Sequence, residues 1–277
     1  MLKQYGIIGH PVAHIMSPFI HTRLMTLATI EGQYTVTEVL PERLAQAMTE
    51  LSSFDGYNVT LPYKQEIIPF LDSLSHEAEL YGAVNTVYKG KGYNTDSTGF
   101  IKTIEHNNMS LDGKVLIIGA GGASSMFAAE AAMYGSDVTV AVRSQSVDKA
   151  MSLADDIRVK LNIPDVKVCA MEELDVDFDL LINGTPVGMH PYPDSCPVSD
   201  SVISRCKAVL DAVYNPSKTL LLKKAEAMDK RSVGGMPMLV WQAAASQEIW
   251  NDVSFSVDVI EKIIQETKVE QFKRFGY

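Results

Sequence analysis

Apolar and polar positions follow two alternating periods through the first hundred residues. Short apolar runs at 5–9 and 56–60 and an alternating run at 33–40 are typical of β-strands. Between them, residues 18–31 and 41–51 carry apolar side chains at helical spacing, and the second of these segments opens on a proline, which suits a first helical turn. This β-α-β-α-β order predicts a parallel sheet with helices on its faces.

A second series of strands and helices begins near residue 101. The apolar run at 115–118 suits a central parallel strand, and it is followed by a glycine-rich turn and an alanine-rich helix at 124–134. Later strand patterns lie at 137–142, 166–170, 178–182 and 208–213. This order predicts a doubly wound dinucleotide-binding unit of the Rossmann type.

The last part of the chain returns to helical patterns, at 237–250 and 257–268. We expect these helices to pack back on the first unit, because the nucleotide unit already has its full set of strands. The sequence therefore predicts an α/β protein of two domains. We expect residues 1–100 with 239–277 to form a substrate-binding and catalytic domain rich in parallel strands, and residues 101–238 to form the dinucleotide-binding domain.

Composition and charge narrow the classes of function. Of the 277 residues, 46% are hydrophobic and 21% are charged, which is typical of a packed globular protein. The net charge of −10 leaves no basic stripe to neutralise phosphates and argues against a nucleic-acid partner. No apolar stretch approaches the roughly 18 residues of a membrane-spanning helix, and the first residues lack a secretory apolar segment. We therefore expect a cytoplasmic protein without a membrane partner.

The turn after the apolar run at 115–118 reads Gly119-x-Gly121-x-x-Ser124. A glycine-rich turn between a buried strand and a helix brings backbone N–H groups and the positive end of the helix up to a pyrophosphate. The third glycine of the usual fingerprint is replaced by Ser124, but the placement between strand and helix strengthens the motif. The sequence predicts a dinucleotide site here.

The choice of dinucleotide depends on the end of the next strand. Proteins that bind NAD usually place Asp or Glu there, where the carboxylate bonds the ribose 2′-hydroxyl. This chain has Arg143 and Ser144, and no carboxylate follows until Asp148. Arg143 can stack on adenine or clamp a 2′-phosphate, and the Ser144 hydroxyl can donate to that phosphate. NADP is the predicted cofactor.

Lys64 is the first candidate for chemistry. It follows the strand pattern at 56–60 and the helix breaker Pro62, at the carboxyl end of a parallel strand, where ligands bind. Oxidation of an alcohol needs a base near the hydroxyl, and the reverse reaction needs an acid. Taken alone, Lys64 reads as a solvated lysine, and the motifs around it decide the interpretation.

Ordered motifs accompany Lys64 along the chain. They are Gly9-x-Pro11-Val12-x-His14, Ser17-Pro18, Asn58-Val59-Thr60-Leu61-Pro62-Tyr63-Lys64, Gly82-Ala83-Val84-Asn85-Thr86, Gly92-Tyr93-Asn94-Thr95-Asp96-x-x-Gly99-Phe100, Asn183-Gly184-Thr185-Pro186-Val187-Gly188-Met189, Asp211-x-x-Tyr214-x-Pro216 and Gly235-x-x-Met238-Leu239-Val240-x-Gln242-Ala243. Together they resemble the shikimate dehydrogenase family, from residue 5 to about residue 250. The resemblance implies an NADP-dependent oxidoreductase that interconverts 3-dehydroshikimate and shikimate in aromatic amino-acid biosynthesis.

The resemblance also implies roles for individual residues. Lys64 and Asp96 take the places of the family's catalytic lysine and its paired aspartate. The residues implied to contact the substrate are Ser17, Asn58, Thr60, Asn85, Tyr214 and Gln242. Those implied to bind the cofactor are Gly119, Ala120, Gly121, Gly122, Ala123, Arg143, Ser144, Thr185, Met189 and Gly235. No metal site is predicted, and the partners are small molecules bound by a monomer or homodimer.

Ile15 is the clearest departure from the family pattern. The family usually shows His-Ser-x-Ser-Pro, whose two hydroxyls hold the substrate carboxylate, whereas this chain has His14-Ile15-Met16-Ser17-Pro18. Losing one hydrogen bond to a charged group costs about 1.5–3 kcal/mol. Two alternatives therefore stay open: a dehydrogenase of quinate or a substituted shikimate analogue, and a weakly catalytic ligand-binding member of the family.

Overall fold

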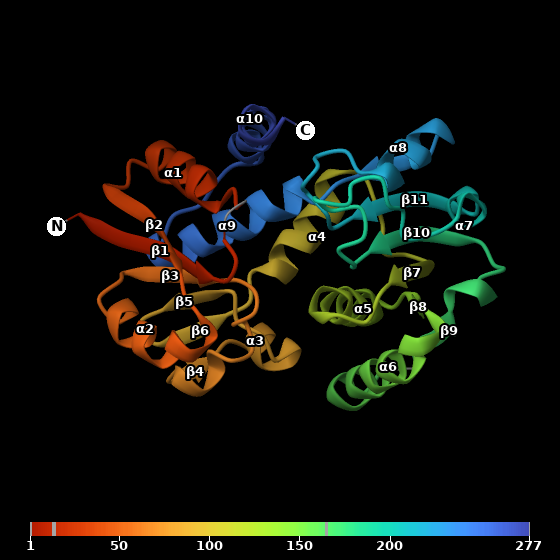
Figure 1. The fold of residues 1–277 in the computed structure, drawn as a ribbon, viewed down its shortest axis with the longest axis horizontal. Helices are drawn as coiled ribbons and strands as arrows, with labels where there is room; N and C mark the ends of the chain where they lie inside the picture. The colour runs from red at the N-terminus through yellow and green to blue at the C-terminus, as the bar shows by residue number, and fades with distance from the viewer. Residues whose placement is uncertain (1, 13–14, 164–165, 277) are drawn as a thin grey trace. The chain divides into compact units, whose positions relative to one another are not determined.

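The computed structural model describes residues 2–12, 15–163 and 166–276, so that His14 of the first motif lies outside the described residues (Figure 1). The chain divides into two compact units. One comprises Met1–Gly99 with Leu239–Gly276, and the other comprises Phe100–Met238. The boundaries fall inside two helices, α4 (Asp96–His106) and α9 (Met236–Asn251).

The first unit contains a six-stranded sheet in the order β2-β1-β3-β5-β6-β4. Its strands are β1 (Lys3–Gly9), β2 (Gly32–Glu38), β3 (Gly56–Val59), β4 (Ser73–Leu74), β5 (Thr86–Tyr88) and β6 (Lys91–Tyr93). β1 pairs in parallel with β2 and β3, as the apolar pattern predicts. β5 is antiparallel to both of its neighbours, β3 and β6, which the pattern did not reveal.

A two-residue turn connects β5 to β6. Lys89 and Gly90 both have positive φ, 47° and 75°, which matches the twist of a tight β-hairpin. The pairing of Thr86 with Tyr93 continues into a bond from the Asn85 backbone N–H to the Tyr93 carbonyl at 3.0 Å. The hairpin therefore brings the residue before β5 next to the residues that follow β6.

Helices cover both faces of the first sheet. They are α1 (Ser17–Leu27), α2 (Leu44–Leu51) after a 3-10 turn at Pro41–Arg43, α3 (His76–Tyr81), α10 (Val257–Phe275) and the later part of α9, with a further 3-10 turn at Ile68–Phe70. One apolar core joins the sheet to α2 and α3. On the other side of the sheet, Tyr5 of β1 stacks on Trp250 of α9, with ring centroids 4.9 Å apart. The predicted return of the C-terminal helices to the first unit is confirmed.

The second unit contains an entirely parallel sheet in the order β12-β11-β10-β7-β8-β9. Its strands are β7 (Lys114–Ile118), β8 (Asp137–Val142), β9 (Lys167–Ala170), β10 (Phe178–Asn183), β11 (Cys206–Asp211) and β12 (Arg231–Val233). This is the order of a doubly wound dinucleotide-binding fold. The predicted fold class, including its Rossmann-type unit, is confirmed.

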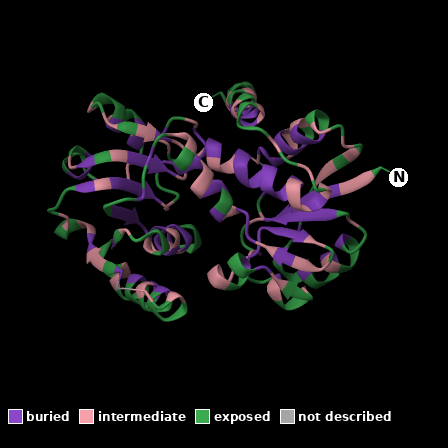
Figure 2. Cartoon of the chain, turned by 180° about the vertical axis from the view of Figure 1, so that it is seen from behind, coloured by how far each residue is buried: buried purple, intermediate pink, exposed green. Residues whose placement is uncertain are grey.

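The helices of the second unit are α5 (Gly122–Tyr134), α6 (Val147–Leu161), α7 (Asp200–Ser204) and α8 (Leu220–Ala227), with 3-10 turns at Ser144–Ser146 and Met171–Glu173. Figure 2 shows buried residues concentrated in the strands and in α9, with exposed residues on the outer faces of helices such as α6. No helix of the described residues is long and apolar enough to cross a membrane.

Candidate functional site

Lys64 lies on a turn that its neighbours hold firmly. Tyr63 is fully buried, and its hydroxyl donates to the carbonyl of Val39. The Lys64 carbonyl accepts from the Val84 backbone N–H at 2.7 Å, which ties the turn to the segment before β5. Because the turn is fixed on both sides, the Lys64 side chain starts from a defined point at the carboxyl end of β3.

Asp96 is the first residue of α4, where a carboxylate interacts favourably with the helix dipole. The Asp96 backbone N–H donates to Asn94 Oδ1 at 3.1 Å, so Asn94 fixes the start of the helix. Lys64 Nζ donates to Asp96 Oδ2 at 2.7 Å, and the two side chains are 27% and 22% exposed. The structure thus joins two residues 32 positions apart in an ion pair that solvent still reaches.

Asn85 supports this pair from behind. Its Nδ2 lies 3.0 Å from the second carboxylate oxygen of Asp96 and 3.3 Å from Gln242 Oε1. Its Oδ1 accepts from the Thr95 backbone N–H at 2.8 Å. Asn85 is 2% exposed, so these bonds form away from water. Four predicted site residues, Lys64, Asp96, Asn85 and Gln242, therefore form one connected group.

Asn58 lies deeper in the same network. Its Nδ2 lies 3.1 Å from the Asn85 carbonyl and 3.0 Å from the hydroxyls of Thr86 and Ser246, and its Oδ1 accepts from Tyr34 at 2.7 Å. Buried polar groups are costly unless they are hydrogen-bonded, and this cluster satisfies that requirement internally. Asn58 thus links β3, β5 and α9 beneath the ion pair.

A neutral histidine underlies the network. His21 of α1 stacks on Tyr34, with ring centroids 4.2 Å apart, and its Nδ1 lies 3.0 Å from Gln247 Nε2. Complete burial lowers the pKa of His21 to about 3, because the cationic form would lose its hydration. His21 is therefore uncharged at neutral pH.

Ser17 and Thr60 were predicted to contact the substrate. Ser17 is buried as the first residue of α1. Thr60 directly follows β3, and its backbone N–H donates to the Ile8 carbonyl at 2.9 Å. Thr60 lies at the carboxyl end of β3, which pairs in parallel with β1, and parallel strands bind ligands at this end. Their contacts with a substrate stay predictions.

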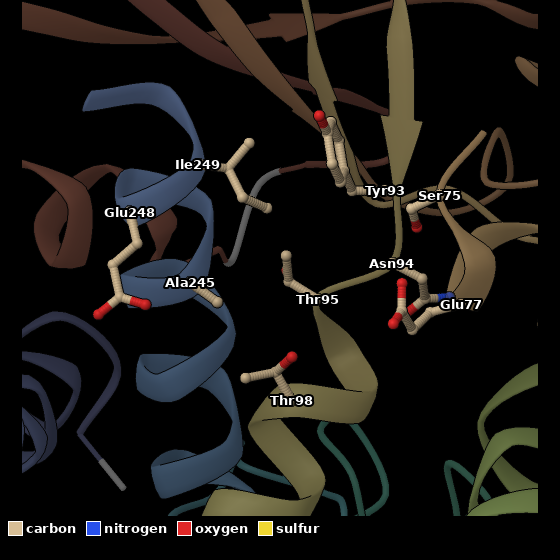
Figure 3. Close-up of a pocket in the computed structure, with 9 residues that line it drawn as sticks. All are labelled: Ser75, Glu77, Tyr93, Asn94, Thr95, Thr98, Ala245, Glu248 and Ile249. Carbon is tan, nitrogen blue, oxygen red and sulfur yellow. The ribbon is translucent and has the colours of Figure 1, made fainter. Parts of the chain in front are cut away.

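A pocket of about 340 Å³ lies close to this network. Figure 3 shows Thr95 and Thr98, at the start of α4, facing Ala245 and Ile249 of α9 across it. Thr95 also bonds Asn85, so one residue borders both the pocket and the ion-pair network. The pocket is lined by Ser75, Glu77, Tyr93, Asn94, Thr95, Thr98, Ala245, Glu248 and Ile249, and Lys64 is absent from this lining.

In the second unit, β7 ends at Ile118, and Gly119 opens the tight turn that follows it. Gly119 has φ of 103°, a conformation that favours glycine. A Cβ atom built on it would lie 2.6 Å from Thr185 Cγ2 and 2.9 Å from Ser124 Oγ. Gly119 is therefore required by the turn itself, and the turn packs against Thr185, another predicted cofactor residue.

The next residues of the turn are open. Gly121 is the N-cap of α5 and has no side chain to bond the first N–H groups of the helix. A Cβ atom on Gly121 or Gly122 would meet no other atom within 4 Å. Backbone N–H groups at a helix start bind phosphates. Ala120 precedes and Ala123 follows these glycines, and the whole segment fits the pyrophosphate of a dinucleotide.

Ser124 fills the position of the third glycine of the fingerprint. It is fully buried, and its hydroxyl donates to the Ile118 carbonyl at 3.3 Å. A Cβ atom on Gly184, which follows β10, would lie 2.3 Å from Ser124 Oγ. Gly184 thus provides the space that the serine needs between helix and strand.

Arg143 and Ser144 are exposed and directly follow β8. The Ser144 hydroxyl donates to Glu172 Oε2 at 3.2 Å. Glu172 belongs to the short 3-10 turn after β9. Among the described residues, no ion pair involves the Arg143 guanidinium. The residues directly after β8 include no carboxylate, yet the fold brings one to Ser144 from the turn after the neighbouring strand β9.

Asn183 connects Thr185 to a buried carboxylate, that of Asp211. The Thr185 N–H and hydroxyl donate to Asn183 Oδ1 at 3.0 and 2.7 Å, and Asn183 Nδ2 donates to Asp211 Oδ1 at 2.9 Å. Thr219 Oγ1 and the Val213 N–H also donate to Asp211. Burial raises the pKa of Asp211 to about 6, although these three hydrogen bonds act in the opposite direction. The network joins the ends of β10 and β11.

Three other predicted residues lie on separate loops of this unit. Met189, after β10, is 41% exposed. Tyr214 follows β11, and burial raises its pKa. A Cβ atom on Gly235 would lie 2.1 Å from the Ala212 carbonyl oxygen, so packing alone requires glycine there.

Several residues of both sites were missed from the sequence. Ser246 lies one helical turn after Gln242, and Thr95 lies inside a quoted motif, so both offered a signal. Glu172 offered none, because its approach to Ser144 depends on the pairing of β8 with β9.

Known proteins are similar to this chain in sequence and in fold. Residues 7–87 match the family model of the shikimate dehydrogenase substrate binding domain. The chain is 39% identical to a shikimate dehydrogenase (NADP(+)) of Caldanaerobacter subterraneus subsp. tengcongensis, over 94% of this chain and 96% of that protein.

Solved structures are similar over almost the whole length. A chorismate mutase/shikimate 5-dehydrogenase fusion protein from Clostridium acetobutylicum is 31% identical, with a TM-score of 0.89 and 98% of each chain covered. Shikimate 5-dehydrogenase from Thermus thermophilus, solved in complex with NADP(H) and shikimate, is also 31% identical, with a TM-score of 0.86 over 96% of this chain and 99% of that one.

Proposed function

Since the chain belongs to the shikimate dehydrogenase family, we propose that it is an NADP-dependent enzyme that interconverts 3-dehydroshikimate and shikimate. The activity belongs to aromatic amino-acid biosynthesis. The proposed partners of the protein are small molecules. We propose that the protein is cytoplasmic and is a monomer or homodimer.

The observation that carries the proposal is the 2.7 Å contact between Lys64 Nζ and Asp96 Oδ2. A lysine that is held by a carboxylate and still reached by solvent can give a proton to a reacting oxygen and regain one from water. The pair lies at the carboxyl end of β3, where parallel sheets place their ligands.

Lys64 is the proposed acid in one direction and base in the other. NADPH, when bound, would supply the hydride for reduction of the ring ketone. The Lys64 ammonium gives its proton to the carbonyl oxygen, and the neutral amine accepts the hydroxyl proton in the reverse reaction. Asp96 holds Lys64, and Asn85 holds Asp96, so the position of the amine is kept through both steps.

The polar residues predicted to contact the substrate have two proposed roles. Ser17, Thr60, Gln242 and Tyr214 contact the hydroxyls and carboxylate of the substrate, because hydroxyl and amide groups can each donate and accept. Asn58 and Asn85 were predicted from the family resemblance to touch substrate as well. Their bonds to protein partners support a role in fixing the other groups.

The residues predicted to bind the cofactor are assigned to different parts of the dinucleotide. Backbone N–H groups near Gly121 and Gly122 bind the pyrophosphate, and Arg143 with Ser144 binds the 2′-phosphate. Thr185, Met189 and Gly235 are proposed to lie near the nicotinamide. Support comes from the open space at the two glycines and from the absence of an ion-pair partner for Arg143 among the described residues.

The direct test follows NADPH absorbance with purified protein and 3-dehydroshikimate. We expect NADPH oxidation that depends on both substrates, and reduction of NADP⁺ when shikimate is supplied instead. A panel with quinate and amino-substituted analogues, each run with NADP⁺ and NAD⁺, fixes the substrate. No turnover with shikimate in the presence of either cofactor would refute the proposal, and tight binding without turnover would indicate a ligand-binding protein.

A further inference from the structure

The end of β9 lies beside the end of β8, and this pairing decides which side chains meet there. Val142 pairs with Ala170 in parallel register, so the residue two positions beyond each strand faces its counterpart. Those residues are Ser144 and Glu172, and the Ser144 hydroxyl donates to Glu172 Oε2 at 3.2 Å. Both residues are exposed, so a bound nucleotide can reach them.

We propose that Glu172 is a specificity-determining residue that lowers the preference of this protein for NADP over NAD. The inference rests on the proposed function, because it concerns the same cofactor site. Ser144 is the hydroxyl proposed to donate to the 2′-phosphate, and Glu172 already accepts from that hydroxyl.

The chemistry of the two cofactors differs at one group. A 2′-phosphate offers only acceptor oxygens and negative charge at neutral pH, so it competes with the Glu172 carboxylate for the Ser144 proton and is repelled by it. A ribose 2′-hydroxyl can donate to a carboxylate, which is how proteins that bind NAD usually recognise it. Glu172 therefore disfavours NADP and favours NAD.

Glu173 and Arg143, two charged neighbours, do not take the role proposed for Glu172. The Glu173 carboxylate bonds the end of β9 instead, where it accepts from the Ala170 backbone N–H at 3.2 Å. Arg143 is the cation next to Ser144, and no ion pair of the described residues occupies it. Its guanidinium is proposed to attract the 2′-phosphate, so we expect the cofactor preference to be a balance between Arg143 and Glu172.

The test compares Glu172→Gln with Glu173→Gln, which removes the same charge one residue away and keeps an acceptor for the Ala170 N–H. Calorimetry gives the dissociation constants of NADP⁺ and NAD⁺ for both variants and the wild type. The pair 2′,5′-ADP and 5′-ADP isolates the 2′-phosphate in the same assay. Circular dichroism checks that the variants are folded.

We expect Glu172→Gln to raise the ratio of NADP⁺ to NAD⁺ affinity about tenfold, the effect of one charged hydrogen bond of roughly average strength. The ratio for Glu173→Gln should change less than about threefold, since that carboxylate does not contact Ser144. The same ordering is expected for 2′,5′-ADP against 5′-ADP.

An unchanged ratio in Glu172→Gln, or an equal change in both variants, would overturn the inference while leaving the proposed function intact. Wild-type protein that binds neither dinucleotide would overturn both.

Discussion

In the first unit, side chains build the site. Lys64, Asp96, Asn85 and Asn58 are connected by hydrogen bonds between buried or half-buried groups, and each is fixed by its neighbour. In the second unit, the turn from Gly119 to Gly122 presents backbone N–H groups and open space. A site for proton transfer needs one ionisable side chain held in a fixed position. A site for a pyrophosphate needs backbone N–H groups that no side chain covers.

The largest effect is expected on the first unit from Lys64→Ala. The change removes the proposed proton donor, so kcat should fall by about 10²–10⁴-fold, while the dissociation constant of NADP⁺ should stay within about twofold. Steady-state kinetics and calorimetry measure the two quantities. Lys102→Ala removes an exposed lysine of α4 that pairs with Glu105 and serves as the control. Equal activities of the two variants would remove Lys64 from the mechanism.

The second unit also contains a buried ionisable group, and Asp211→Asn tests it. Burial raises the pKa of Asp211 from 3.8 to about 6, so the folded state holds this proton over a window in which the unfolded chain has lost it. Its contribution to stability is full below about pH 4 and is lost as pH rises through 6. The asparagine side chain of the variant does not ionise, so its contribution to stability does not change over this pH range.

The unfolding free energy of wild type minus that of Asp211→Asn should therefore fall by on the order of 3 kcal/mol between about pH 4 and pH 7. Urea unfolding at a series of pH values measures it. Parallel stability curves for the two proteins would show that Asp211 ionises without cost in the folded state.

Two glycines of the same turn should respond differently to alanine. Gly121→Ala should leave stability unchanged, because a Cβ atom there meets nothing within 4 Å, yet it should fill space that the nucleotide is proposed to occupy. We expect the dissociation constant of NADP⁺ to rise about tenfold to a hundredfold. Gly119→Ala should instead cost about 1–3 kcal/mol of stability, because φ is 103° and Thr185 is close.

Thermal unfolding and calorimetry on both glycine variants separate these outcomes. If Gly121→Ala unfolded like Gly119→Ala, the open space at Gly121 would have a structural role that the contacts do not indicate.

The smallest effect is expected from Ile15→Ser. Ile15 cannot donate a hydrogen bond, and a serine there restores the donor found in the family pattern. The KM for shikimate should fall about tenfold, with kcat little changed, because the bond to the carboxylate is equally present in ground and transition states. Ile15→Ala controls for loss of the isoleucine side chain. Equal KM values in both variants would show that this position does not read the carboxylate.

The two units also differ in how far the sequence predicts them. Continuous apolar runs such as 115–118 and the alternation at 33–40 predicted the parallel strands, because burial on one or both faces sets their pattern. The hairpin of β5 and β6 escaped prediction, since each strand has three residues and the turn is Lys89-Gly90 instead of the common Asn-Gly. Strands this short are defined by their partners.

The same limit applies to the sites. The pairing of Lys64 with Asp96 was predicted from motifs, because each lies in a recognisable segment of sequence. The contact of Ser144 with Glu172 and the network around Asp211 were not predicted. Both depend on the register between neighbouring strands, and no periodicity within one segment encodes that register.

The close fit of Ser124 against Gly184 restricts how the sequence can evolve at these two positions. A methyl group at 184 has no room while residue 124 is serine, whereas a glycine at 124 would relieve the nearest of these contacts. The effect of changing either position thus depends on the other, which is epistasis between the two ends of a packed pair. An alanine at 184 is therefore expected to be tolerated only after Ser124 has been replaced by glycine.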